Sequence, residues 1–386
     1  MYFDKFSTNR AAISFSKFEG ELSNEYNLIV TPTAGDTIDN QLLSIKEALG
    51  DFMNEIGSNQ DSIVFQRFFV SDFTNQSEIL KNTDVFGCNC AVSIVQQSPL
   101  SGIKVALWTC ILEGKNDSHF TKEKDEHKMV MAHNGYKHVY NTQMHSDRPE
   151  ACSYDQTNKI FTDYLDLLKG QNLNLEEHCL RTWFYVRDID NNYAGMVKAR
   201  NQIFDNHQLT KETHFIASTG IEGRFADPSV SVLLDAYAVG GVQPEQIKFL
   251  EARDFLNPTH EYGVAFERGT SVEYGDRRHI FISGTASIDN KGEIVHVGDV
   301  DGQIGRAFEN IRALLKEADA NLQDLNSMIV YLRDVGDYQV VENYLQKNYS
   351  EIPYVIVLAP VCRPGWLIEI ECMAIKLIKN EAYSCF

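Results

Sequence analysis

Four side chains with distinct chemistry lie close together near the C-terminus, in the segment VCRPGWLIEIE at residues 361–371. They are the thiol of Cys362, the guanidinium of Arg363 and the carboxylates of Glu369 and Glu371. The surrounding apolar run, 358–371, is typical of a buried strand, where charged side chains are rare unless paired. An arginine matches a carboxylate bidentately, and a buried carboxylic acid can deliver a proton. The segment therefore predicts either a buried ion pair or a site for a carboxylate-bearing ligand.

The two glutamates have different expected roles. The two-residue period of a strand places Glu369 and Glu371 on one face, where burial and mutual repulsion favour the protonated form of one of them. Glu369 lies between Ile368 and Ile370 and is the candidate proton donor. For Glu371 we favour an ion pair with a Lys or Arg of a neighbouring sheet.

Cys362 allows two interpretations. A buried free thiol is usually an inert small hydrophobe, whereas the adjacent Arg363 could lower its pKa and make it a nucleophile or a proton relay. In a regular strand the two side chains point to opposite faces, so only an irregular strand brings them together. Pro360 and Pro364 bracket the stretch and favour such an irregularity.

The composition limits the classes of function. The 386 residues suffice for two or three domains, and 43% of them are hydrophobic, enough to build cores. A net charge of -19 argues against nucleic acid as a partner. No apolar run is long enough to span a membrane and residues 1–6 lack an apolar signal core, so we expect a soluble cytoplasmic protein. The eight scattered cysteines favour free thiols, and none has a zinc-ligand spacing, so no metal is predicted.

An internal repeat positions the C-terminal segment. Residues 41–72 and 303–334 align without a gap at an offset of 262 (303 − 41 = 262), and both contain a helical pattern, a polar turn and an apolar strand ending at an Asp. A weaker middle copy has its helix near 160–168 and its strand at 180–188. Each copy begins with a hairpin-like stretch and ends with a strand pair: 26–33 and 92–112, 136–144 and 214–239, 278–288 and 354–375.

These patterns predict three tandem units, 1–117, 118–245 and 246–386, each with the order β-β-α-β-α-β-β. Such units favour an α+β fold with helices on one face of each sheet. Three related units in one chain predict a single-chain pseudo-trimer, and hence a monomer. The alternative is two domains with an insertion.

The charged residues occur in the third copy alone. The offset of 262 pairs Cys362 with Leu100, Arg363 with Ser101 and Glu369 with Leu107, and the middle copy has Leu233 at the position of Glu369. Residues required by the fold should recur in every copy. The pattern therefore favours a functional site in the third unit, with a buried Arg–Glu pair local to one sheet as the alternative.

The third unit resembles the Rid/YjgF family through HIFISGTASI (279–288), the helix that begins with Gln303, IVYLRD (329–334) and the final strand. The resemblance implies a chorismate-mutase-like fold and a cleft between neighbouring units. There an Arg holds a substrate carboxylate and a Glu orients a water or a proton, roles that fall on Arg363 and Glu369. The family name sometimes carries an endoribonuclease L-PSP label, which the acidic charge does not support for this chain.

The span from 180 to 371 is similar to the chorismatases, single-chain relatives of the Rid proteins. Five segments in order carry the resemblance: RTWFYVRDID (181–190) with KAR (198–200), IASTGI (216–221), EYGVAFER (261–268), SGTASI with GDVDGQ (283–288, 298–303), and VCRPGWLIEIE (361–371). Phe184 stands where the family tends to have Asn, and the first 115 residues show little of the pattern. The resemblance implies cleavage of chorismate without metal or organic cofactor. A Cys at position 362 is typical of the branch that makes 3-hydroxybenzoate.

Chorismate has two carboxylates and an enol ether, so its cleavage requires anion binding and a proton donor. We predict Glu369 and Cys362 as catalytic residues. The predicted substrate-binding residues are Arg363, Arg200, Arg181, Tyr262, Arg268, Gly284 and Ala286. An arginine of this kind belongs to a surface or interface ion pair as often as to a binding site. Tyr262 could order a ring hydroxyl of the substrate or pack as a structural residue. The alternatives are a Rid-type enamine or imine deaminase and a non-catalytic small-molecule binding protein.

Overall fold

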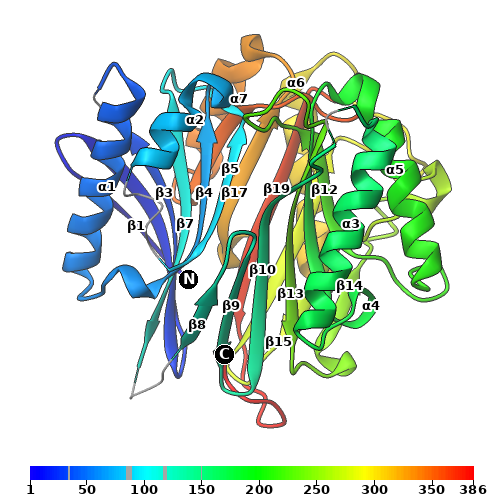
Figure 1. Ribbon diagram of the computed structural model, residues 1–386, viewed down its shortest axis with the longest axis horizontal. Helices are drawn as coiled ribbons and strands as arrows, with labels where there is room; N and C mark the ends of the chain where they lie inside the picture. The colour runs from blue at the N-terminus through cyan, green and yellow to red at the C-terminus, as the bar shows by residue number, and fades with distance from the viewer. Residues whose placement is uncertain (34, 84–88, 116–119, 149) are drawn as a thin grey trace.

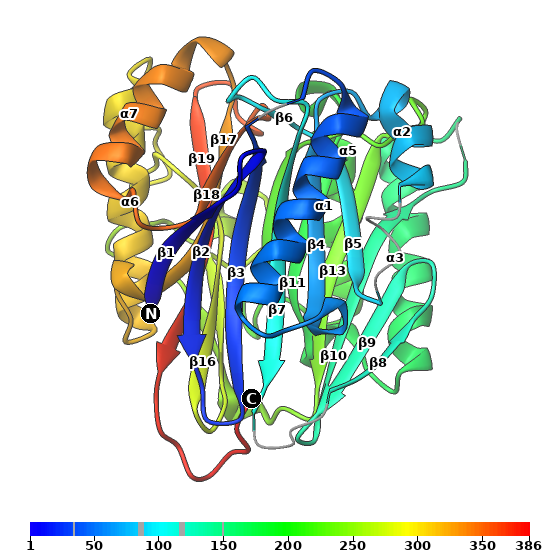
Figure 2. The ribbon, with the colours of Figure 1, turned by 90° about the vertical axis from the view of Figure 1, so that its left-hand side faces the viewer.

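The computed structural model describes residues 1–33, 35–83, 89–115, 120–148 and 150–386. Three mixed β-sheets lie around a common centre, and the long helices lie on the outside of the molecule (Figure 1). Figure 2 shows α1 across the outer face of the first sheet. One hydrophobic cluster includes residues of all three sheets, so the inner faces of the sheets share a core. No helix in the described part of the chain is long and apolar enough to cross a membrane.

The three units repeat one order of elements, three strands, a helix, a strand, a helix and two strands. The first unit has β1 (Tyr2–Ser7), β2 (Ala11–Glu19), β3 (Ser23–Pro32), α1 (Ile38–Glu55), β4 (Ile63–Val70), α2 (Phe73–Asn82), β5 (Ala91–Gln96) and β7 (Val105–Gly114), with the short β6 (Ser98–Pro99). The second has β8 (Thr121–Lys124), β9 (Lys128–His133), β10 (Tyr136–His145), α3 (Ser153–Gly170), β11 (Cys179–Val186), α5 (Ile189–Asn206), β12 (Ala217–Glu222) and β13 (Val232–Gly240), with the short α4 (Leu175–His178). The third has β14 (Ile247–Leu250), β15 (Gly269–Glu273), β16 (Arg277–Ala286), α6 (Val300–Glu317), β17 (Leu325–Leu332), α7 (Tyr338–Asn348), β18 (Tyr354–Leu358) and β19 (Ile368–Leu377).

The repeated segments form equivalent elements for the same physical reason. In α1 and α6 the apolar residues at helical spacing are buried, including Leu42 and Leu49 in one and Ile304 and Ile311 in the other. The strands β4, β11 and β17 are buried along all eight residues, because a helix layer covers one face and the shared core the other. The α+β prediction and the three-unit pseudo-trimer are confirmed.

The units are joined head to tail into a ring. The edge strand of each unit pairs with the connection between the last two strands of the next unit. The three pairings are Gln96 with Arg224, Ile221 with Val361, and Val357 with Pro99. Equivalent contacts that pass from each unit to the next and close after three steps define pseudo-threefold symmetry.

Three expectations from the sequence need correction. The hairpin-like stretches each correspond to one strand, β3, β10 or β16, and two of them extend one or two residues past its end, because the turns of these three-stranded meanders precede them. The expected strand at 358–371 is interrupted between Leu358 and Ile368, since Pro360 and Pro364 cannot donate to a ladder. Glu369 lies opposite Tyr331 as Ala106 lies opposite Phe69, so its counterpart in the first unit is Ala106, one residue before the expected Leu107.

Candidate functional site

A cavity of about 200 Å³ lies where the second and third units meet. The second unit contributes α5 and β12, and the third contributes the end of β16, the start of β19 and the connection between β18 and β19. Eight of the nine predicted site residues line it: Arg200, Tyr262, Arg268, Gly284, Ala286, Cys362, Arg363 and Glu369. Tyr193, Ser218, Gly220, Val264, Phe266, Ile288 and Trp366 complete the lining.

Glu369 is the one carboxylate among the described residues that line the cavity. It stands in β19 with 5% of its surface exposed. Burial raises its pKa to about 8, and the charge of Glu371 adds to the rise, whereas Arg181 and Arg268 oppose it. At neutral pH this side chain is therefore predominantly a neutral acid that can donate a proton.

Gly284 gives the Glu369 carboxyl its space. The pairing of β16 with β19 shifts register between Ile282 and Thr285, and this irregularity places Gly284 against Glu369. A Cβ atom built on Gly284 would lie 2.0 Å from Glu369 Oε1, well inside van der Waals contact. The position of the Glu369 carboxyl therefore requires a glycine at 284, because any larger side chain there would displace the carboxyl.

We expect Gly284→Ala to lower the turnover rate about tenfold or more, because a misplacement of 1 Å at a reacting group can cost that much. Single-turnover kinetics on the folded variant would measure this effect. Gly50→Ala is the matched control, since nothing lies within 4 Å of a Cβ at Gly50 in α1. Its turnover should equal that of the parent, and a Gly284→Ala variant with parental turnover would contradict the assignment of Gly284.

Three guanidinium groups surround Glu369, and none forms an ion pair with a carboxylate of the described residues. Arg200 projects from α5 with 1% of its surface exposed, and its Nε and Nη2 have no hydrogen-bond partner in the described structure. Arg268 donates from Nη2 to Asn257, at 3.0 Å to the backbone oxygen, while its Nε has no partner there. Buried cations without counter-charges are costly, so the arrangement favours an anionic ligand.

Arg363 is held by aromatic rings. Its Cζ lies 4.4 Å from the ring centre of Tyr262 and 4.8 Å from that of Trp366, and Arg268 lies on Tyr262 at 5.5 Å. Trp366 is fixed in turn, because its Nε1 donates to the backbone oxygen of Ser287. Tyr262 therefore packs between two guanidinium groups and orients them, which leaves their donors available to a ligand.

Cys362 is held as a thiol. Burial raises its pKa to about 12, and the neighbouring Glu369 adds to the rise. Arg363 lowers this pKa, but desolvation outweighs the adjacent charge, so of the two interpretations the structure supports the unreactive buried thiol. Tyr193 lines the cavity with Cys362 and affects the pKa of the thiol. Cys362 is thus a proton donor or a packing group here, and not a ready nucleophile.

Arg181 lies outside the cavity. It is buried in β11, and its Nη2 donates to Glu371 Oε2 at 2.9 Å and to Thr219 Oγ1. Glu371 also accepts from Trp183 Nε1 at 2.9 Å. The predicted role of Arg181 in substrate binding is therefore replaced by an ion pair, because its charge is already compensated. The preferred interpretation of Glu371, a pair with an arginine of a neighbouring sheet, is the one observed.

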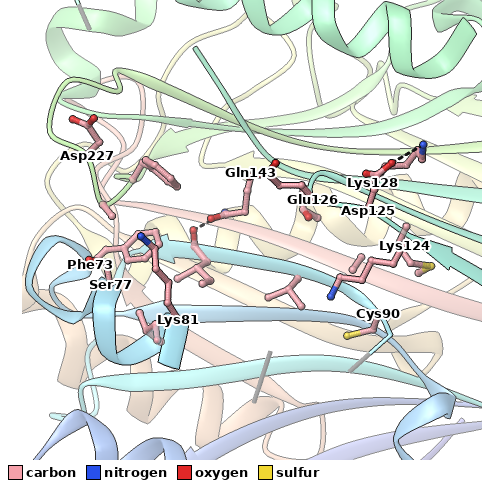
Figure 3. A pocket seen from close by; sticks show the side chains of 18 residues that line it. Phe73, Ser77, Lys81, Cys90, Lys124, Asp125, Glu126, Lys128, Gln143 and Asp227 are labelled. Carbon is pink, nitrogen blue, oxygen red and sulfur yellow. Dashed lines mark hydrogen bonds and ion pairs between the residues drawn. The ribbon is translucent and has the colours of Figure 1, made fainter. Parts of the chain in front are cut away.

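The equivalent clefts between the other units have lost this chemistry. A cleft of about 580 Å³ between the first and second units contains Gln143, the register counterpart of Gly284, and its side chain donates to the oxygen of Ile94 (Figure 3). Asp227 stands in that cleft where the third unit has Arg363, in a connection of the same length. Leu233 replaces Glu369. This cleft therefore has no guanidinium at the position of Arg363 and no acid at the position of Glu369.

The sequence prediction missed Tyr193, which touches the thiol and lines the cavity beside Arg200. A signal was present, because residues seven apart share one face of a helix and Tyr193 precedes Arg200 by seven. Trp366 belongs to the C-terminal segment 361–371, but the sequence suggested no role for it. Its position between Pro364 and β19 does not reveal that it stacks on Arg363.

Comparisons with known proteins agree on the third unit. The endoribonuclease L-PSP family model matches residues 270–376. A RutC family protein of Pyrococcus abyssi is 38% identical over 100 residues, 25% of this chain and 78% of that protein. The 3-aminoacrylate deaminase RutC of Acinetobacter baylyi is 30% identical over 98 residues, 25% of this chain and 77% of that enzyme. The crystal structure of a chorismatase, 17% identical, superposes with a TM-score of 0.64 and covers 92% of this chain and 99% of its own. The chain therefore belongs to the RutC family through its third unit, and as a whole it has the fold of a chorismatase.

Proposed function

We propose that the chain cleaves chorismate, or a closely related carboxylated enol ether, and releases pyruvate without a metal or organic cofactor. The observation that carries the proposal is the combination in one cavity of a neutral buried acid, Glu369, with three guanidinium groups that lack carboxylate partners in the described structure. The fold shared with a chorismatase supports it. The same cavity suits a substrate that carries two carboxylates and must be protonated.

The charges of the cavity match such a substrate. With Glu369 neutral, Arg200, Arg268 and Arg363 give the lining an excess of positive charge that a dianion can balance. Each guanidinium can bind one carboxylate by two parallel hydrogen bonds, which also fixes its orientation. The bound dianion offsets the positive charge around Glu369 and so helps to retain its proton. Binding and proton donation therefore support each other.

The reaction begins with proton transfer from Glu369 to the methylene carbon of the enolpyruvyl group, which leaves a positive charge on the ether-bearing carbon. Addition of water there forms a hemiketal, and cleavage of its bond to the ring oxygen gives pyruvate and a dihydroxycyclohexadiene carboxylate. Loss of the side chain with aromatisation instead gives pyruvate and a hydroxybenzoate, without net uptake of water. The thiol of Cys362, next to Glu369, is placed to return or relay a proton in either course.

A second candidate is hydrolysis of an enamine or imine derived from an amino acid. The 3-aminoacrylate deaminase relative favours it, because it matches the unit that contains Glu369 and Arg363. In that reaction Arg363 binds the single substrate carboxylate, and Glu369 directs water to the imine carbon with release of ammonia. Two of the three guanidinium groups would then have no ligand, which is why we rank this candidate second.

The direct test mixes the purified protein with chorismate and follows the mixture by chromatography with mass detection. We expect pyruvate and one ring product in equal amounts, and the ring product identifies the branch. Arg363→Ala should abolish this conversion. Chorismate that stays unchanged, together with ammonia release from 2-aminoacrylate, would replace the first candidate with the second.

The dependence of the rate on pH separates proton donation from water activation. Because the acid form of Glu369 is the active one in enol-ether cleavage, the rate should be constant below a pH of about 8 and fall about tenfold per pH unit above it. A carboxylate that activates water gives the opposite profile, with a rate that rises through the same pH. Initial rates between pH 6 and 10 at substrate concentrations well below KM, which report the free protein, would distinguish the two, and a rising profile contradicts the acid role.

A further inference from the structure

A cluster of four buried charges lies between the sheets at the centre of the molecule. This axial cluster consists of Arg67 in β4, Arg181 in β11, Asp235 in β13 and Glu371 in β19. Arg67 Nη2 donates to Asp235 Oδ2 at 3.0 Å, and its Nη1 lies 3.8 Å from Glu371 Oε1. Two positive and two negative charges therefore balance, with at most 6% of any of these side chains exposed.

All three units contribute to the cluster: the first contributes an arginine, the second an arginine and an aspartate, and the third a glutamate. The strand positions equivalent to Arg67 hold Trp183 and Ile329, and those equivalent to Glu371 hold Trp108 and Asp235. The first unit contributes no acid or arginine to the described lining of the two clefts that it forms with its neighbours, but it supplies the Arg67 charge. The acid recurs at one strand position in the second and third units, whereas Arg67 has no charged equivalent, so closure of the ring does not by itself account for the cluster.

Two routes connect the axial cluster with Glu369. Along β19, Glu371 is two residues away on the same face of the strand. Across the sheets, Arg181 donates to both Glu371 and Thr219 Oγ1, which also accepts from the backbone N–H of Gly284 at 3.0 Å. Gly284 is the residue against which the Glu369 carboxyl packs. The cluster is thus connected with the surroundings of the proton donor by two routes.

We propose that Glu371, held by Arg67 of the first unit and Arg181 of the second, is a positioning residue that keeps Glu369 in its protonated form. Glu371 does not line the cavity and acts only through Glu369. Its negative charge opposes the loss of the proton, and the two arginines limit that effect by partly neutralising it. The first unit thereby sets the protonation of a site to which it contributes no lining residue. This inference rests on the proposed role of Glu369 as an acid.

The other groups around Glu369 do not provide this influence. It is faced by Tyr331 on β17, Arg181 on β11, Arg268 before β15 and Cys362 after β18, while Tyr193, Arg200, Tyr262 and Arg363 share the cavity. The arginines favour the charged carboxylate, and the tyrosines and the thiol are neutral at physiological pH. Glu371 is the one negative charge among the described groups near Glu369, so its removal has a defined sign.

The test measures the pH at which Glu369 loses its proton in two variants that change the net charge of the axial cluster in opposite directions. Glu371→Gln adds a net positive charge to the cluster and should move the alkaline limb of the rate down by about one pH unit. Arg67→Gln adds a net negative charge and should move it up. Glu273→Gln, which removes a carboxylate paired with Arg278 elsewhere in the third unit, is the control and should leave it unchanged. Opposite shifts cannot arise from general loss of stability.

A second readout does not depend on turnover. With ¹³C-labelled glutamate side chains, the carboxyl resonance of Glu369 is identified by its absence in Glu369→Gln, and its midpoint should shift as the rate does. Shifted midpoints without activity on chorismate would keep the inference and overturn the proposed function. If Glu371→Gln does not fold, Trp183→Phe removes the indole N–H that Glu371 accepts and keeps an aromatic ring against Arg67 and Arg181, and it should raise the midpoint. Midpoints that stay within 0.2 of a pH unit of the parent, or that shift in one direction in both charge variants, would overturn the inference.

Discussion

Replacement of Glu369 by Gln should lower turnover by about 10²- to 10⁴-fold, the range for loss of a general acid. The amide has nearly the same shape but cannot give up a proton to carbon at any accessible pH. Because Glu369 is largely neutral before substrate binds, the change leaves the charge of the cavity almost unaltered. Substrate affinity should therefore stay within a few-fold of the parent, and the loss should fall on kcat.

The control for Glu369→Gln is Glu342→Gln, which removes a carboxylate from the cleft between the third and first units. Its turnover should equal that of the parent. Equilibrium binding of the substrate, measured by calorimetry on each variant, separates lost chemistry from lost binding. A Glu369→Gln protein that binds no substrate would show that the carboxyl acts as a ligand, and one that retains full turnover would falsify the acid assignment.

Replacement of Arg200 by Met should weaken substrate binding and stabilise the protein at the same time. Burial lowers the pKa of Arg200, as expected for a cation whose counter-charge is absent from the folded protein. Loss of its hydrogen bonds to a bound carboxylate should cost about 2 kcal/mol or more, roughly 30-fold in affinity. An apolar side chain of similar length removes the buried charge and should raise the free energy of unfolding by about 1 kcal/mol or more.

Arg181→Met is the matched control for Arg200→Met. Arg181 is equally buried but paired with Glu371, so its loss leaves one uncompensated negative charge in the axial cluster and should lower the free energy of unfolding by about 3 kcal/mol or more. Urea unfolding of both variants, with and without substrate, would compare the two. Destabilisation by both changes to the same extent would show that Arg200 has a compensating partner in the folded protein, and the anion site would lose its main support.

The sequence predicted the features that depend on local periodicity. The helices α1 and α6 could be found because apolar residues recur on one helical face in both copies, and the site could be placed because one copy differs from the others at Glu369. The error of one residue in the counterpart of Glu369 has a simple cause. The connection before β19 has nine residues (359–367), whereas the one before β7 has eight (97–104), so the offset changes from 262 to 263.

Contacts between distant residues were not predictable from the sequence. Arg67 and Glu371 are separated by 304 positions, and nothing near either residue identifies the other. The choice between the two interpretations of Cys362 could not be made from the sequence, because the sequence shows the adjacent Arg363 but not the depth of burial that raises the pKa of the thiol. The commitment of Arg181 to Glu371 was missed for the same reason, since its segment contains no acidic partner before Asp188.

Of the three clefts between units, one has guanidinium groups and an acid among the residues that the structure describes, and this determines how many ligands a chain is expected to hold. An assembly of three identical subunits has three copies of its site, and occupation of one can change the affinity of the next through the shared interfaces. The described residues of this chain form one such site. We therefore expect a stoichiometry of one ligand per chain, with a hyperbolic saturation curve and a Hill coefficient of one. The absence of cooperativity is thus a direct result of joining three unequal units in one polypeptide.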